Sequence, residues 1–168
     1  MQIGYRDMEK KLYKTPSESI VENVRELRNE DINGYGRLFG GRLMEWIDST
    51  AGLAAVRHSN RMVVTASVDN LQFKSGARLG DIIVIRAKVT YVGHTSIEVR
   101  VDTYVEDVPT GLRHPINRAY LTEVCVDKDG RAVEVPYRLK PETISEKAEY
   151  DGALRRIENR KARRKEGF

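Results

Sequence analysis

Residues 39–58 read FGGRLMEWIDSTAGLAAVRH, and this stretch decides the fold. Its apolar residues recur at the spacing of one helical face, and no proline interrupts it. Glycines gather before or at its start, and only Gly52 lies inside it. The stretch therefore predicts one long helix in the middle of the chain. The residues at helical spacing are Phe39, Leu43, Ile47, Ala51 and Ala54.

The segments before this helix predict a strand and then a loop. Residues 19–27, SIVENVREL, indicate a first strand. Residues 29–41, NEDINGYGRLFGG, are dense in glycine, asparagine and aspartate, which favours a loop. Residues 1–17 are polar and lack clear periodicity, so we expect an N-terminal arm there.

After Asn60 the apolar period becomes two, which is the period of β-strands. Strands are predicted at residues 62–73, from residue 81 onward and at residues 118–126, and Gly93-His94 predicts a tight hairpin turn between two of them. In each of three strands, alternate residues are expected to share one face. In the first strand these are Met62, Val64, Ala66 and Val68, and in the second Ile83, Ile85, Ala87, Val89 and Tyr91. In the third they are Ile97, Val99, Val101, Thr103 and Val105, with Glu98, Arg100 and Asp102 on the opposite face.

Strands joined by short links pair antiparallel, because parallel neighbours need long crossovers. The predicted fold class is therefore α+β, an antiparallel sheet packed against one helix. One face of such a sheet stays open unless a partner covers it. We expect three segments: the polar arm at 1–17, one domain at 18–140, and a basic C-terminal helix or tail at 141–168.

Composition narrows the class of protein. The chain has 168 residues, 40% of them hydrophobic and 32% charged, which is typical of one globular domain. No apolar run reaches the roughly 20 residues that cross a bilayer, so we expect no membrane insertion. Cys125 is the single cysteine and lies in an apolar strand pattern, which excludes a disulfide within the chain and favours burial and a cytoplasmic location.

Positive charge is concentrated at the C-terminus. Residues 153–168 hold seven lysines and arginines against two glutamates, so this segment is +5 and the rest of the chain is −1 of the net +4. The segment is either a contact for nucleic acid or anionic membrane, or a solvated helix face with pairs such as Arg155–Glu158, or a subunit contact. It lacks interleaved aromatic residues, so we favour the last two and expect no nucleic-acid partner.

Asp48 is the best catalytic candidate on physical grounds. On a helix its neighbours are Met44, Glu45, Ala51 and Gly52, three of which are apolar or glycine. A carboxylate that loses hydration on such a stripe is suited to act as a general base. The alternative is an aspartate on the rim of the helix, exposed to water.

Backbone and amide groups near the helix start offer further candidates. Gly40 and Gly41 open the helix, where free N–H groups and the helix dipole favour a developing oxyanion. Asn33 lies in the preceding loop, where its amide either donates to a carbonyl or serves as a turn residue. The histidines 58, 94 and 114 lack ligand spacing, and with one cysteine no metal site is expected.

Residues 31–48, DINGYGRLFGGRLMEWID, resemble the signature of hotdog-fold acyl-CoA thioesterases. That motif runs D-x-N-x-x-G-x-x-F/H-G-G, then an apolar helix turn, then an acidic residue, and it matches here without a gap. The likeness extends over about residues 19–136, through VVTASVDNLQF, VTYVGHTSIEV and AYLTEVCVDKDGRAVEVP. Glu123 departs from the family pattern, which is usually apolar at this position.

The resemblance implies a long central helix wrapped by a curved antiparallel sheet of about five to six strands. It also implies a homodimer, often assembled as a trimer of dimers, with active sites at the dimer interface. By position, Asp48 matches the acidic residue of the helix and Asn33 the loop asparagine, and in the family these two often act from opposite subunits. Gly40 and Gly41 match the glycines of the helix start.

The resemblance further implies acyl-CoA as substrate and no bound cofactor. The turn Gly93, His94, Thr95 and Ser96 matches the segment that approaches the nucleotide end of CoA, and Arg57 at the helix end is a further candidate for its phosphates. Asp48 would act either as a general base on water or as a nucleophile that forms an anhydride. A non-catalytic acyl-CoA binder or sensor on the same scaffold is the alternative function.

Overall fold

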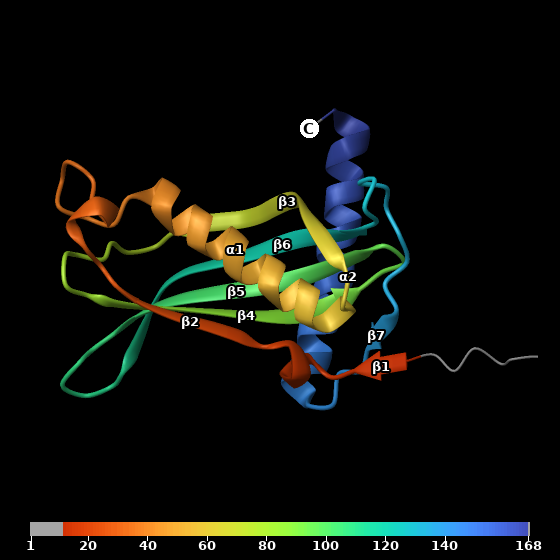
Figure 1. The fold of residues 1–168 in the computed structure, drawn as a ribbon, viewed down its shortest axis with the longest axis horizontal. Helices are drawn as coiled ribbons and strands as arrows, with labels where there is room; N and C mark the ends of the chain where they lie inside the picture. The colour runs from red at the N-terminus through yellow and green to blue at the C-terminus, as the bar shows by residue number, and fades with distance from the viewer. Residues whose placement is uncertain (1–11, 168) are drawn as a thin grey trace, which may run out of the picture.

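A five-stranded antiparallel sheet wraps around one long helix, as predicted (Figure 1). The computed structural model describes residues 12–167, apart from the side chain of Asn70. The strands lie in the order β2-β4-β5-β6-β3. Their bounds are β2 Val21–Glu26, β3 Met62–Phe73, β4 Ile82–Val92, β5 Ser96–Glu106 and β6 Arg113–Val126, and the central helix α1 is Gly40–Ser59. β6 begins five residues before the predicted strand, because residues 113–117 continue the pairing with β5.

Smaller elements hold the two ends of the domain together. Strand β1, Leu12–Lys14, runs parallel to β7, Tyr137–Leu139. Short 3-10 helices η1, Pro16–Ser19, and η2, Asn29–Asp31, flank β2, and helix α2 spans Ile144–Glu166. The expected N-terminal arm thus contains β1 and the start of η1, and its residues 1–11 lie outside the described residues.

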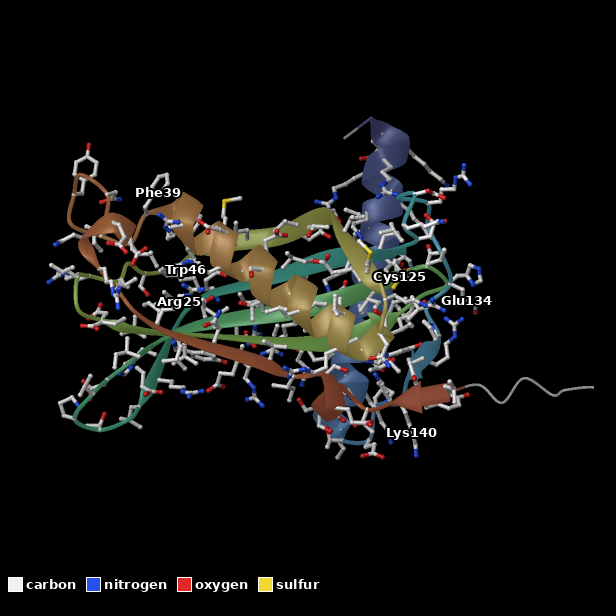
Figure 2. All side chains as sticks on the ribbon, in the orientation of Figure 1. Arg25, Phe39, Trp46, Cys125, Glu134 and Lys140 are labelled. Carbon is white, nitrogen blue, oxygen red and sulfur yellow. The ribbon has the colours of Figure 1, made fainter. Side chains whose placement is uncertain are left out.

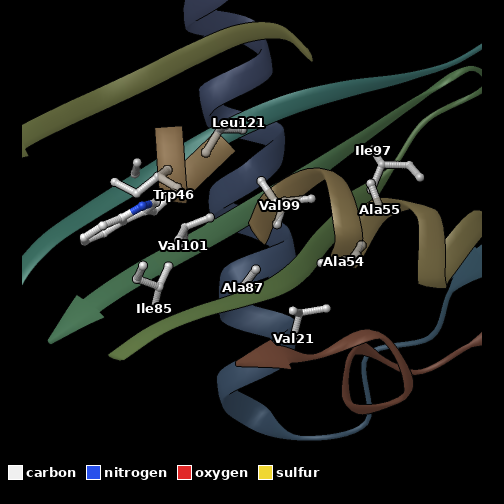
Figure 3. Close-up of a cluster of buried hydrophobic side chains, with 14 of the residues drawn as sticks. Val21, Trp46, Ala54, Ala55, Ile85, Ala87, Ile97, Val99, Val101 and Leu121 are labelled. Carbon is white, nitrogen blue, oxygen red and sulfur yellow. The ribbon is translucent and has the colours of Figure 1, made fainter. Parts of the chain in front are cut away.

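The core lies between α1 and the concave face of the sheet. Ala54 and Ala55 are fully buried on α1, and their small side chains allow the helix to lie close to β4 and β5 (Figure 3). Leu43, Ile47 and Ala51 are buried as predicted, whereas Phe39 is exposed because it precedes the first helical turn. Asn60 ends α1 in the left-handed conformation, with φ of 53°.

Two bulges change the predicted strand faces. The register between β3 and β6 slips between Thr65 and Ser67, so the expected common face of Met62, Val64, Ala66 and Val68 is wrong. Val64 is exposed, whereas Thr65 and Val68 face α1. The bulge therefore determines which β3 side chains reach the helix.

The second bulge lies in β4, between Val89 and Tyr91. Tyr91 was expected on the same face as Val89, but its ring packs against Tyr150 of α2, with centroids 5.2 Å apart. The predicted faces of β5 are confirmed, since Val99 and Val101 are buried and Glu98 contacts α2.

Helix α2 covers part of the convex face, which one chain was expected to leave open. Buried Glu98 on β5 accepts a hydrogen bond from Arg156 at 2.8 Å. Asp69 on β3 pairs with Arg160 and Arg163, each at 2.8 Å. Basic residues of the C-terminal segment thus dock α2 on the sheet.

No helix within residues 12–167 is long and apolar enough to span a membrane.

Candidate active site

Asp48 lies on the exposed side of α1, at a cavity of about 400 Å³ between the helix and β3. Most of the lining is apolar, so the cavity accepts a hydrocarbon group next to the carboxylates of Glu45 and Asp48. The lining residues are Gly41, Met44, Glu45, Ile47, Asp48, Val68, Leu71 and Leu121. Asp48 is thus exposed, as the alternative of a rim aspartate expected, and it also lies among the apolar neighbours on which its selection depended.

Two residues that sequence analysis did not select complete the surroundings of Asp48. The Thr65 hydroxyl on β3 donates a hydrogen bond to Asp48 Oδ1 at 2.6 Å. The same hydroxyl oxygen lies 3.2 Å and 3.3 Å from the two carboxyl oxygens of Glu123 on β6. Thr65 and Glu123 are register partners across the β3–β6 ladder, so their side chains share the face that meets α1.

Glu123 is fully buried. Burial raises the pKa of its carboxyl to about 7; the Thr65 hydroxyl opposes this shift and the negative charge of Asp48 adds to it. The sequence did carry a signal for this residue, because a charged residue interrupts the apolar strand YLTEVCV. Thr65 gave no such signal, because its orientation depends on the bulge.

The central helix begins at Gly40, as sequence analysis expected, and the role of this helix start as an oxyanion site stays a prediction. Gly40 and Gly41 occupy its first turn, where backbone N–H groups have no partner within the helix. A Cβ at Gly41 would lie 2.6 Å from the ring of Phe39, and one at Gly40 would lie 3.3 Å from the ring of Phe73. These glycines therefore also allow the two rings to pack at the start of α1, where Figure 2 shows Phe39.

Asn33 closes the loop before α1. Its side-chain oxygen accepts hydrogen bonds from the backbone N–H groups of Tyr35 at 2.9 Å and Arg37 at 3.2 Å. The turn role considered for Asn33 is therefore present, and it uses only the oxygen of the amide. No hydrogen bond joins Asn33 to Asp48 within the described part of this single chain.

The expected CoA segment is a hairpin turn whose backbone is well anchored. Gly93 N–H donates to Ser96 C=O at 2.8 Å, and Arg138 donates to Gly93 C=O at 2.5 Å. The imidazole of His94 lies 3.7 Å from Glu134, which Figure 2 shows beside the turn. Arg57, at the end of α1, donates to Ile20 C=O and so ties the helix to the residue before β2.

The sequence matches known thioester hydrolases. A family model, the thioesterase superfamily, matches residues 35–111. An acyl-CoA thioester hydrolase of Bacillus subtilis is 38% identical over 148 residues, which cover 88% of this chain and 86% of that protein.

Solved structures extend the match to the fold. The acyl-CoA hydrolase of Staphylococcus aureus, in complex with butyryl-CoA, CoA and CoA disulfide, has a TM-score of 0.86 and 39% identity, over 92% of this chain and 94% of that chain. Other structures of that enzyme carry alanine in place of one asparagine, one aspartate or one threonine. A hexameric acyl-CoA thioesterase is 38% identical, with a TM-score of 0.86, over 90% of this chain and 97% of that chain.

Identity over most of both chains shows a common family, and the shared curved sheet and long helix show a common fold. This chain therefore belongs to the hotdog-fold acyl-CoA thioesterases of the thioesterase superfamily, and it is a thioester hydrolase.

Proposed function

We propose that this chain hydrolyses acyl-CoA to a free fatty acid and CoA, with Asp48 as the general base or the nucleophile. The observation that carries the proposal is the position of Asp48. Its carboxylate lies at an apolar cavity, accepts a hydrogen bond from Thr65 and is on the same helix as the free N–H groups of Gly40 and Gly41.

The chemistry follows from this arrangement. The acyl chain enters the apolar cavity, and the thioester carbonyl lies near Gly41, whose N–H stabilises the developing oxyanion. In the general-base route Asp48 takes a proton from water while the water oxygen bonds to the carbonyl carbon. The carbon–sulfur bond then breaks, and the thiolate of CoA takes the proton from Asp48. In the other route Asp48 attacks the carbon itself, and water cleaves the resulting anhydride.

The altered residues of the S. aureus enzyme support this assignment. Its asparagine, aspartate and threonine are separated by 15 and 17 residues, the same separations that Asn33, Asp48 and Thr65 have in this chain. We therefore include Thr65 in the proposed site beside Asn33 and Asp48.

We further propose that two chains form each active site. No hydrogen bond joins Asn33 to Asp48 in the described part of one chain, so we propose that the amide NH₂ comes from the partner subunit. The hexameric relative supports a trimer of dimers. The Gly93–Ser96 turn and Arg57 are proposed to meet the nucleotide end of CoA. A cytoplasmic location is proposed from the buried, unpaired Cys125.

The test is thiol release from acyl-CoA by the wild type and Asp48→Asn. Asn is near-isosteric, so the fold should persist, while loss of general acid–base catalysis lowers kcat by about 100- to 10,000-fold. Glu45→Gln is the matched control, because Glu45 is an exposed carboxylate that lines the same cavity about one turn earlier. Asp48→Asn with more than half of wild-type turnover would refute the proposal.

A single turnover in water carrying heavy oxygen separates the two routes. Label that appears in the Asp48 carboxylate indicates the anhydride, because water attacks that intermediate at either carbonyl. Label found only in the fatty acid supports the general base.

A further inference from the structure

A buried carboxyl group lies one hydrogen-bonded step behind Asp48. Glu123 projects from β6 onto the face that meets α1, and both its oxygens are within 3.3 Å of the Thr65 hydroxyl. Because Glu123 has no exposed surface, it cannot touch substrate or water in the cavity. The hydrogen-bonded connection from Glu123 to Asp48 runs through Thr65.

The protonation state of Glu123 follows from counting the protons that Thr65 and the two carboxyls can donate. A threonine hydroxyl has one proton to donate and two lone pairs to accept. The 2.6 Å bond to Asp48 has the length of a hydroxyl that donates to an ionised carboxylate, so the Thr65 proton points to Asp48. Glu123 then stays close to the Thr65 oxygen only by donating its own proton to it.

The surroundings of Glu123 favour the neutral acid. From α1 the charged neighbour is Asp48, which is negative, and from β3 it is the uncharged Thr65. On β5 its register partner is the apolar Ile97. A buried carboxylate with no cation beside it is strongly disfavoured. The pKa of about 7 that burial gives Glu123 agrees with a proton that is held below neutral pH.

We propose that Glu123 is a positioning residue of the site, which in its protonated form donates to Thr65 and so directs the Thr65 hydroxyl onto the Asp48 carboxylate. The inference rests on the proposed role of Asp48. When Glu123 loses its proton, two carboxylates compete for the one proton of Thr65, and the orientation of Asp48 is no longer fixed. Turnover should therefore fall as pH rises through neutrality, while substrate binding is unchanged.

The experiment compares pH profiles of kcat and KM for the wild type and Glu123→Gln. Glutamine has nearly the same shape, keeps an N–H donor for the Thr65 oxygen and does not titrate. We expect wild-type kcat to fall about tenfold between pH 6 and pH 8.5, with little change in KM. Glu123→Gln should match the wild type at pH 6 within about twofold and remain flat above it. Ionisation of the phosphates of CoA is common to both proteins and cancels in the comparison.

Infrared difference spectra of the intact wild-type protein give a reading that does not depend on activity or on the variant. Ordinary glutamate carboxyls, with a pKa near 4, are ionised at pH 6, so a protonated-carboxyl band that persists there and disappears around pH 7 supports the inference. Its absence at pH 6, or the same high-pH fall of kcat in both proteins, overturns it. Failure of the proposed role of Asp48 would be seen in a separate measurement, because the Asp48→Asn variant would then remain active.

Discussion

Thr65 lies between the carboxyls of Asp48 and Glu123, and its single hydroxyl proton determines how the two are connected. Its methyl group contributes nothing to this hydrogen bond, whereas the hydroxyl lies 2.6 Å from Asp48. At the scale of residues, the sequence identified Asp48 through its apolar neighbours but gave no reason to choose Thr65. The contact exists because one extra residue in β3 turns Thr65 toward α1.

Thr65→Val should lower kcat by about 10- to 100-fold, since a hydrogen bond to a charged group contributes about 1.5–3 kcal/mol. Valine has nearly the same shape but no hydroxyl. Thr65→Ser is the matched control, because it keeps the hydroxyl and should stay within about threefold of the wild type. Thiol release at pH 6 measures both variants. Equal kcat for the valine and serine variants would show that the hydroxyl has no role.

At the scale of elements, the helices and strands follow from periodicity, whereas their exact faces do not. The central helix and the Gly93-His94 turn were predictable because apolar spacing and turn residues are local signals. The bulges at Ala66 and Thr90 arise from pairing with distant strands, which no local pattern encodes. Glu123 was visible as a departure from an apolar strand, but its partner Thr65 depends on one of these bulges.

The end of α1 is fixed by a buried imidazole. His58 Nδ1 lies 2.9 Å from the Ser19 hydroxyl of η1, and Nε2 lies 3.2 Å from the C=O of Tyr137 in β7. If Nε2 carries the proton and donates to Tyr137, then Nδ1 accepts from Ser19, and both bonds use the neutral ring. Burial lowers the pKa of His58 to about 4.

Replacing His58 should therefore reduce acid sensitivity. The folded pKa of about 4 lies below the unfolded value of about 6.5, so the unfolded chain binds more protons between these values. Stability from neutral His58 is fully present above about pH 6.5 and is lost as pH falls toward 4, by about 3 kcal/mol in total.

Urea unfolding midpoints at pH 7 and pH 4.5, at one protein concentration, test this expectation. The midpoint should drop less in His58→Gln than in the wild type, whatever the overall stability of the variant. Glu123 titrates in the opposite sense but is present in both proteins, so it does not affect the difference. Parallel pH dependence in the two proteins would contradict the role of His58.

At the scale of the whole molecule, one side of the chain has the features of a subunit interface. β3 is an edge strand, so the backbone groups on its outer side lack partners in this sheet. Apolar side chains are exposed along the same side, which is unusual for a surface that stays in water. They are Met44, Leu53 and Val56 of α1 together with Val68 of β3.

Gly52 lies on the same side of α1, and beyond its chain neighbours and the backbone of its own helix no described atom lies within 4 Å of where its Cβ would be. A second chain can therefore approach the helix backbone closely there. Asp48 is one turn before Gly52, so a partner at this surface would also approach the proposed catalytic carboxylate. Assembly and activity are thereby linked: light scattering should show a multiple of a dimer, with a hexamer as the expected species.

Two inactive variants should restore activity to each other if Asn33 and Asp48 come from different chains. Asn33→Asp keeps the oxygen that accepts from Tyr35 and Arg37 but removes the NH₂ donor, and Asp48→Asn removes the carboxylate. Each variant alone should be nearly inactive. When they are refolded together in equal amounts, about half of the dimers are mixed, and one of the two sites in each mixed dimer has both native residues. About a quarter of the kcat of identically refolded wild type should return, measured by thiol release. If both residues act from the same chain, every site carries one substitution, and mixing restores nothing.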